Sequence, residues 1–156
     1  MDAREALAIV ADLTRAGVRH VVSGGWGIDA LVGRQTRVHG DLDIGVDAVH
    51  LAEVIALLAR RGYSIALDQS PARLALHAPG GHAVDLHPIS WDGTGMGRQQ
   101  GFDGEVYDYP PGEIVEGRIG GGRVRCISAA LQRRFHSGGP QRERDTADLG
   151  QLDASE

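Results

Sequence analysis

Apolar and polar positions follow two different periods along this 156-residue chain. Within residues 3–16, Leu7, Val10 and Leu13 recur at the spacing of one helix face, which predicts an amphipathic helix. Leu42–Val46 instead carries apolar side chains at every second position, which is the period of a strand. The first half of the chain is therefore predicted to alternate helices with strands.

The same patterns, with glycine and proline as breaks, divide the rest of the chain. Further strands are predicted at residues 18–23, 63–68, 73–78 and 82–89, with two more around the triple glycine of "EIVEGRIGGGRVRCIS". Further helices are predicted at residues 26–32, 48–61, from Ser128 to about 136, and 142–152. Residues 91–104 are rich in glycine and polar groups, and we expect them to form a mobile loop.

This order of elements indicates an α/β fold of the mixed α+β kind. One mixed sheet, with helices mainly on one face, is the natural arrangement for it. The length suits a single domain over residues 1–156, in which 128–152 form a short C-terminal helical part.

Composition narrows the functional classes. The net charge of −5 argues against nucleic acid as a partner. No run of 18 apolar residues exists, and the acidic, amphipathic N-terminus does not resemble a signal peptide, so we expect a cytoplasmic protein without a membrane span. The lone Cys126 excludes an internal disulfide.

All 16 basic residues are arginines. This excludes a Schiff-base lysine and a P-loop lysine. Any phosphate contact from a basic side chain must therefore come from an arginine, which offers a planar fork of donors.

Three acids carry the candidate chemistry. Asp41 and Asp43 flank Leu42 in "HGDLDIGVD", so in a strand their carboxylates share one face about 6.5–7 Å apart. Asp85 interrupts the apolar strand "HAVDLHPIS", where an isolated carboxylate is costly. We expect it to join the other two from a neighbouring strand. Three converging carboxylates predict a Mg²⁺ site for phosphoryl or nucleotidyl transfer.

The glycine-rich turn before these acids has two interpretations. "GWGIDA" matches the dinucleotide-binding pattern, with Asp47 as the ribose-binding acid. Against this, the helix that follows is short, and the next strand carries Asp41 and Asp43 where that fold needs apolar residues. The favoured interpretation is a turn at Gly24 and Gly25 that lets the backbone approach a nucleoside triphosphate.

Side chains near the turn are candidates for nucleotide binding. Arg34 and Arg37 precede the acids and are predicted to neutralise the β- and γ-phosphates. His39 either contacts phosphate, or orients Asp41, or is a loop histidine hydrogen-bonded to backbone. Trp26 either stacks on the nucleotide or packs in the core. His87, before Pro88, is interpreted as structural.

Together, "GGWGIDALVGRQTRVHGDLDIGVDAVH", "VDLHPI" and "RCIS…FHSG…D…DL" resemble the small lincosamide nucleotidyltransferases, and less closely the aminoglycoside 2''-nucleotidyltransferases. Both belong to the polymerase-β-like nucleotidyltransferase superfamily. The resemblance spans roughly residues 15–152. It implies that superfamily's fold and the transfer of a nucleoside monophosphate to a hydroxyl of a drug-like sugar compound, with release of pyrophosphate.

The resemblance also implies partners and roles. The co-substrate would be ATP or another nucleoside triphosphate, with two Mg²⁺ ions held by Asp41, Asp43 and Asp85. The glycine pair would be Gly24 and Gly25. The acceptor would be a small molecule, lincosamide-like or an aminoglycoside. Because so small a domain leaves its acceptor side open, we also expect a homodimer.

The acceptor stays open at this stage. Gly45, Gly139 and residues 91–104 depart from the family pattern, the last two where acceptor recognition is expected. Tyr107, Tyr109 and Glu105 could line a pocket for a sugar. Acids suited to a polycationic aminoglycoside are also present nearby, at Asp92, Asp103, Glu105 and Asp108. Transfer to protein or RNA, as in toxin–antitoxin nucleotidyltransferases, and nucleotide binding without catalysis are the remaining alternatives.

Overall fold

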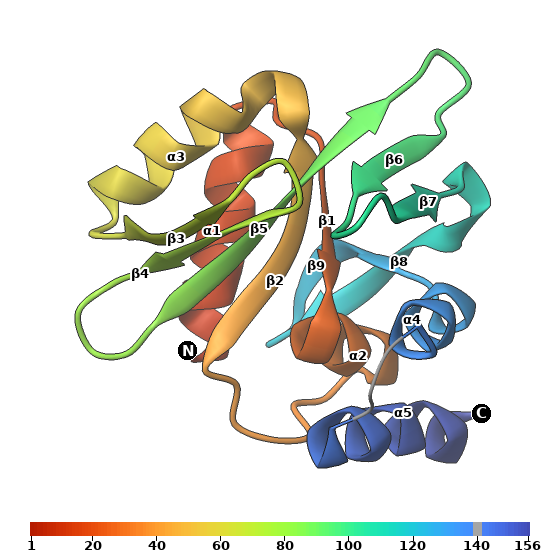
Figure 1. Cartoon of the computed structure of the whole chain (residues 1–156). Helices are drawn as coiled ribbons and strands as arrows, with labels where there is room; N and C mark the ends of the chain where they lie inside the picture. Colours follow the sequence, from red (N-terminus) through yellow and green to blue (C-terminus); the bar gives the residue numbers. More distant parts are fainter. Residues whose placement is uncertain (139–141) are drawn as a thin grey trace.

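The structure, a computed structural model, describes residues 1–138 and 142–156 (Figure 1). Its helices are α1 (Ala3–Arg15), α2 (Gly24–Val32), α3 (Leu51–Arg60), α4 (Ala129–His136) and α5 (Glu143–Ser155). Its strands are β1 (His20–Ser23), β2 (Asp41–Asp47), β3 (Ser64–Gln69), β4 (Arg73–His77), β5 (Ala83–Trp91), β6 (Gly97–Gln100), β7 (Val106–Tyr109), β8 (Ile114–Ile119) and β9 (Gly122–Ile127). No described helix combines the length and apolar character needed to cross a membrane.

Local signals fix the ends of the helices. The Asp2 carboxylate accepts a hydrogen bond from the Glu5 amide at the start of α1. The Ser128 hydroxyl accepts one from Leu131 at the start of α4, as the sequence predicted. Helix α2 begins directly after β1 and ends at Gly33, which adopts a left-handed conformation. The chain therefore turns from strand to helix without a linker at the glycine pair.

The sheet is mixed, as predicted, with the order β3-β4-β5-β2-β1-β9-β8. Strand β2 is antiparallel to β1 and parallel to β5. Beyond the part that pairs with β2, β5 also pairs with β6, which forms a hairpin with β7 (Figure 1). The central position of β2 brings the end of β1 and the middle of β5 to either side of it.

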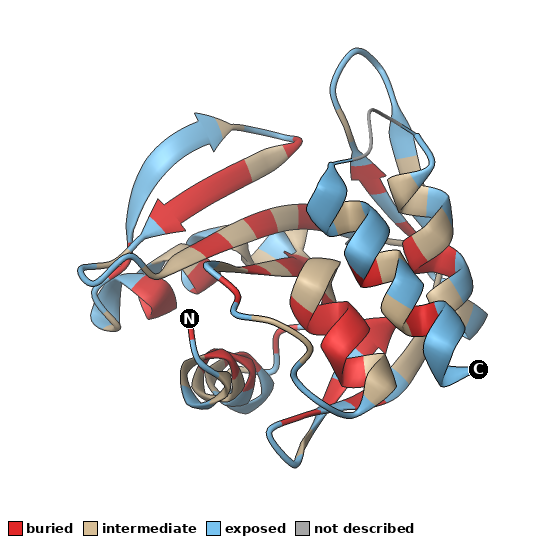
Figure 2. Ribbon diagram, turned by 90° about the horizontal axis from the view of Figure 1, so that it is seen from below, coloured by how far each residue is buried: buried red, intermediate tan, exposed pale blue. Residues whose placement is uncertain are grey.

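The two faces of the sheet differ. Alternate residues of β2 and β5, such as Leu42 and Leu86, are fully buried in the main core, and the alternation of burial along the strands is visible in Figure 2. Apolar residues of α1, α2 and α3 belong to the same core cluster, so these helices cover this face. On the opposite face a smaller cluster joins Leu131 of α4 to Ile89 and Tyr109. The remainder of that face carries the polar side chains of the central strands.

One element was predicted wrongly. Residues 91–104 were expected to form a mobile loop, but Gly97–Gln100 is strand β6. This strand was missed because its residues are polar or glycine, although Gly97 and Gln99 are buried. The final helix also extends to Ser155, past the predicted end. The departure noted at Gly139 lies outside the described residues.

Candidate active site

The turn at the end of β1 brings the backbone against a carboxylate. Gly24 has φ +60°, and a Cβ placed on it would lie 2.3 Å from Oδ2 of Asp43. A Cβ on Gly25 would lie 2.6 Å from Nδ1 of His39 and 2.7 Å from Nη2 of Arg37. Real Cβ atoms do not approach other atoms this closely. Both glycines are therefore required by close packing, and the first also by its backbone conformation.

The three acids share one face of the sheet and come from two neighbouring strands, as the sequence predicted. Asp43 pairs with Asp85 across the parallel strands β2 and β5, and with Ser23 on the other side. Asp41 lies two residues before Asp43 and so points to the same face. Among the residues that the structure describes, however, no three His, Cys, Asp or Glu side chains are placed so that together they could hold a metal ion. The carboxylates thus form a row on one face of the sheet, and the predicted convergence of all three on one point is not found.

The two paired acids have opposite electrostatic surroundings. Burial raises the pKa of Asp43, but a hydrogen bond from His87 and the charge of Arg73 outweigh it, so the net pKa lies below its ordinary value. Burial and the charge of Asp43 raise the pKa of Asp85 above its ordinary value. The charge of Arg73 opposes this increase without cancelling it, with 3.8 Å between its Nη2 and Oδ2 of Asp85. The charged form is therefore favoured at Asp43 and disfavoured at Asp85.

The arginine-rich loop between α2 and β2 is held against α5. Arg37 forms two hydrogen bonds to the Asp148 carboxylate, at 2.8 and 2.7 Å. Arg34 contacts Oε1 of Gln151 at 3.1 Å. The guanidinium of Arg37 also lies beside Gly25. Of the two arginines predicted to meet phosphate, Arg37 thus lies at the glycine turn, and its ion pair fixes it there.

His39 and Trp26 are buried beside the turn. Nε2 of His39 lies 2.5 Å from the Asp29 carboxylate, which also accepts a hydrogen bond from the hydroxyl of Thr36. Trp26 is 2% exposed, and the centroid of its ring lies 4.5 Å from the centroid of the His39 imidazole. Of the two interpretations of Trp26, the structure therefore favours core packing, because no free face remains for a base. The ring of His39 is hydrogen-bonded to the Asp29 carboxylate rather than to the backbone group that the sequence suggested as one partner.

We expect Arg37→Ala to destabilise the fold strongly. Asp148 is 4% exposed, and the substitution leaves its charge without its partner. Because the Arg37 side chain is 34% exposed, we expect a loss of roughly 2 kcal/mol, below that of a fully buried pair. Urea unfolding followed by circular dichroism measures this loss. Arg34→Ala is the control, with an expected loss below about 0.5 kcal/mol because its contact is exposed. Equal losses in the two variants would contradict the assigned role of Arg37.

A pocket of about 270 Å³ is lined by His87 and Arg73, whose side chains contact Asp43 and Asp85. Tyr107 and Tyr109 line it, in agreement with the sequence, whereas Glu105 does not line it and instead accepts a hydrogen bond from the Tyr107 hydroxyl. Within the described residues, none of the acids suggested for a polycationic acceptor lines this pocket. Its walls are aromatic, amide and basic, and consist of Ser23, Ala72, Arg73, His87, Gln99, Gly101, Phe102, Tyr107, Tyr109 and Phe135.

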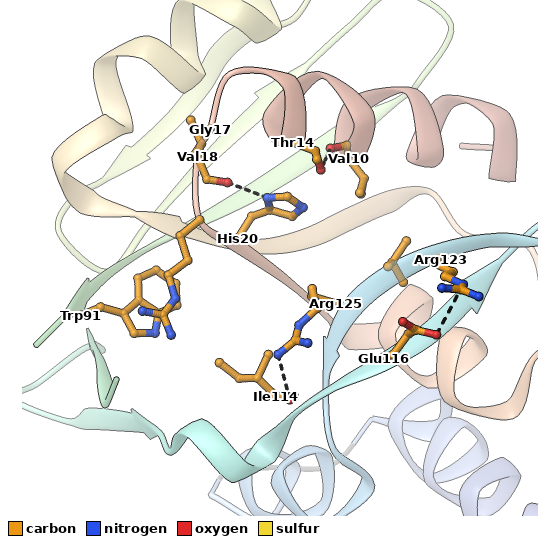
Figure 3. A pocket seen from close by; sticks show the side chains of 12 residues that line it. Val10, Thr14, Gly17, Val18, His20, Trp91, Ile114, Glu116, Arg123 and Arg125 are labelled. Atoms are coloured by element: carbon orange, nitrogen blue, oxygen red, sulfur yellow. Dashed lines mark hydrogen bonds and ion pairs between the residues drawn. The ribbon is translucent and has the colours of Figure 1, made fainter. Parts of the chain in front are cut away.

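A larger pocket, of about 420 Å³, lies elsewhere (Figure 3). It is bordered by the start of β1 and the end of β5, where the guanidinium of Arg19 stacks 4.5 Å from the centre of the Trp91 ring. The residues that contact the aspartates, His87 and Arg73, line the smaller pocket and not this one. We therefore assign the candidate active site to the smaller pocket.

Comparison with known proteins agrees with this geometry. A family model described as aminoglycoside-2''-adenylyltransferase matches residues 5–152. The chain belongs to the aminoglycoside-2''-adenylyltransferase family. The protein is thus a nucleotidyltransferase, and the resemblance found in its sequence is confirmed.

Two curated relatives of this family member are informative. A lincosamide resistance protein of Staphylococcus haemolyticus is 36% identical over 136 residues, which cover 86% of this chain and 84% of the relative. A 2''-aminoglycoside nucleotidyltransferase of Klebsiella pneumoniae is 30% identical over 134 residues, which cover 82% of this chain and 70% of the relative.

Solved structures of relatives share the fold. The lincosamide antibiotic adenylyltransferase LnuA, with lincomycin bound, superposes with a TM-score of 0.88 at 32% identity, covering 98% of this chain and 97% of that one. ANT(2")-Ia in complex with adenylyl-2"-tobramycin gives a TM-score of 0.77 at 21% identity, covering 98% and 88%. The second similarity concerns the fold alone.

The structure adds residues that sequence reasoning missed. Arg73 and Gln99 line the pocket, and His87, interpreted as structural, lies 3.2 Å from Oδ1 of Asp43. Asp148 holds Arg37 from the far end of the chain. The two-residue spacing from Asp85 to His87 puts both side chains on one strand face, and this was the one sequence signal that could have placed His87 at the site. The places of Arg73, Gln99 and Asp148 at the site result from strand order and from contacts between distant segments, which no local sequence pattern predicts.

Proposed function

We propose that this enzyme transfers AMP from ATP to a hydroxyl group of a lincosamide antibiotic and releases pyrophosphate. The observation that carries the proposal is the pocket of aromatic, amide and basic residues, two of which, His87 and Arg73, contact the carboxylates of Asp43 and Asp85. The names of the curated relative and the LnuA structure support the lincosamide class.

The carboxylate row suits Mg²⁺, which prefers oxygen ligands and commonly binds one or two carboxylates together with substrate phosphates. The close approach of the Gly24 backbone to Oδ2 of Asp43 leaves no Cβ between that oxygen and an incoming phosphate. We infer that Asp41 and Asp43, with Asp85, would hold two Mg²⁺ ions. When bound, Mg²⁺ would neutralise charge on the phosphates during transfer.

In the proposed reaction the acceptor oxygen attacks the α-phosphorus of ATP. The bond from that phosphorus to the bridging oxygen breaks, and pyrophosphate leaves in line with the attack. Asp85 faces the same side as Asp43 and stands next to Arg73, which lines the pocket. It can therefore serve as a metal ligand and as the acceptor of the hydroxyl proton, and we propose both roles for it.

The triphosphate is proposed to lie against the turn. The first amides of α2, at Gly24 and Gly25, have no partner within the helix and suit anionic oxygens. Arg37 faces the same turn, and Arg34 is close in sequence. We propose that both guanidinium groups help to bind the β- and γ-phosphates. The proposed homodimer would enclose the open acceptor side.

An aminoglycoside acceptor is the second candidate, because the Klebsiella pneumoniae relative acts on that class according to its name. An aminoglycoside is a polycation and calls for acids near its binding site. Arg73 lines the pocket, and the described residues place no additional acid in its lining. Charge therefore favours the lincosamide.

An acceptor panel tests the proposal. The protein is incubated with Mg²⁺ and ATP labelled in the α-phosphate, together with lincomycin, clindamycin or tobramycin. We expect label in lincomycin and clindamycin, with an equal amount of pyrophosphate, and none without Mg²⁺. Labelled tobramycin alone would assign the aminoglycoside function instead, and no labelled acceptor at all would contradict both.

A further inference from the structure

A chain of hydrogen bonds leads from the wall of the pocket to Asp43. The hydroxyl of Tyr109 lies 2.6 Å from Oε1 of Gln99. Nε2 of Gln99 lies 3.3 Å from Nδ1 of His87, whose Nε2 lies 3.2 Å from Oδ1 of Asp43. The four residues come from β7, β6, β5 and β2 in turn. The chain thus connects the outer hairpin to the centre of the candidate site.

The direction of each bond in this chain is fixed by one backbone carbonyl. The Ala72 oxygen lies 3.4 Å from Nε2 of Gln99, and because a carbonyl only accepts, this end of the side chain is the amide nitrogen. Oε1 therefore faces Tyr109, which donates to it. The amide nitrogen then donates to Nδ1 of His87. The imidazole must carry its proton on Nε2, which donates to Asp43.

Burial makes the arrangement costly to reverse. Gln99 is 8% exposed and Tyr109 is 2% exposed, so a flipped amide would place its nitrogen against the Tyr109 hydroxyl and its oxygen against the Ala72 carbonyl. Two acceptors would then face each other without water to separate them. The side chain of Gln99 consequently has one favourable orientation.

The two oxygens of Asp43 have different surroundings. Oδ1 accepts the hydrogen bond from His87, whereas Oδ2 is the atom that a Cβ on Gly24 would meet. Hydrogen bonds from outer residues commonly fix the tautomer and orientation of groups at metal sites. A fixed donor on Oδ1 keeps Oδ2 turned towards the glycine turn.

We propose that Gln99 is a positioning residue for nucleotidyl transfer: it fixes His87 in the Nε2-protonated tautomer, which in turn orients the Asp43 carboxylate towards the proposed metal. This inference rests on the proposed function for the role of Asp43. The tautomer itself follows from the hydrogen-bond geometry alone, and it can be measured without any substrate.

The first measurement is the ¹⁵N spectrum of the histidine rings in the whole protein at neutral pH. The His87 signals among the seven histidines are assigned by their loss in His87→Gln. We expect a protonated Nε2 and an unprotonated Nδ1. In Gln99→Glu, which places a carboxylate oxygen against Nδ1, the proton should move to Nδ1. A wild-type Nδ1-protonated ring, or an unchanged ring in Gln99→Glu, would overturn the inference.

The second measurement is steady-state transfer at varied Mg²⁺ concentration. Gln99→Met keeps the approximate shape but donates no hydrogen bond, and we expect kcat to fall about 10- to 100-fold with a higher half-saturating Mg²⁺ concentration. The matched control is Gln100→Glu, on the exposed face of the same strand, which should behave as wild type. Thermal unfolding of each variant shows that it is folded.

The outcomes separate the two proposals. If Gln99→Met changes only the KM for the acceptor, Gln99 is a pocket wall and the positioning role is wrong. If wild-type protein modifies no acceptor while its His87 tautomer is as expected, the proposed function fails and the hydrogen-bond chain stands as a structural feature only.

Discussion

Asp43→Asn is expected to abolish nucleotidyl transfer while the protein stays folded. Asp43 lies between Ser23 and Asp85 on the neighbouring strands, and its Oδ2 faces the glycine turn. An amide in place of the carboxylate removes the charge that would bind Mg²⁺, and metal stabilisation of the transition state is worth several kcal/mol. We therefore expect kcat to fall by at least about 10³-fold. Pyrophosphate release under saturating substrates measures it.

The stability of the metal-free protein provides a control for this prediction. The lowered pKa of Asp43 means that its ionised form stabilises the fold above the unfolded-state pKa, so Asp43→Asn should lower the Tm at pH 7. The raised pKa of Asp85 means that its ionisation costs stability above the folded-state pKa, so Asp85→Asn should raise the Tm. Both variants should be inactive. Shifts of the same sign, or activity in Asp43→Asn, would contradict the assigned electrostatics or the metal-binding role.

Gly24→Ala is expected to impair both the fold and the reaction. The new Cβ would lie 2.3 Å from Oδ2 of Asp43, so either the carboxylate or the turn must move. The φ of +60° adds about 1–2 kcal/mol of backbone strain for alanine. A displacement of about 1 Å at a reacting centre can cost on the order of 10²-fold in rate. Urea unfolding and the transfer assay measure the two effects separately.

Gly17→Ala is the matched control for Gly24→Ala. Gly17 also has a positive φ, of +71°, but a Cβ there meets nothing within 4 Å. This variant should therefore lose a similar strain energy and keep its transfer rate. If Gly24→Ala were as active as Gly17→Ala, the close approach of the turn to Asp43 would have no catalytic importance.

The acids could be predicted from the sequence because strand geometry is local. Asp41 and Asp43 are two residues apart, which places them on one face of any strand. Asp85 breaks an apolar strand, which indicates a function for a carboxylate that is costly to bury. Their meeting required only that the two strands be neighbours, and β2 and β5 pair directly.

The surroundings of the acids could not be predicted, because they depend on contacts between distant segments. Gln99 lies in a polar stretch without a strong hydrophobic period, although this stretch forms strand β6 between β5 and β7. Asp148 is 111 residues away from Arg37 along the chain. The sequence allows more than one interpretation of Trp26 and His39, since only the packing of α2 against the following loop decides their burial. Local patterns therefore predict the three acids, whereas the residues that hold and orient them depend on tertiary packing.

The most direct test is a crystal structure with Mn²⁺ in place of Mg²⁺ and a non-hydrolysable ATP analogue, in which anomalous scattering locates the metal. We predict metal coordinated by carboxylate oxygens of Asp41 and Asp43, with Asp85 on the same side and the triphosphate against Gly24 and Gly25. Metal bound only by phosphates or at another surface, with the three carboxylates uncoordinated, would contradict the proposed site.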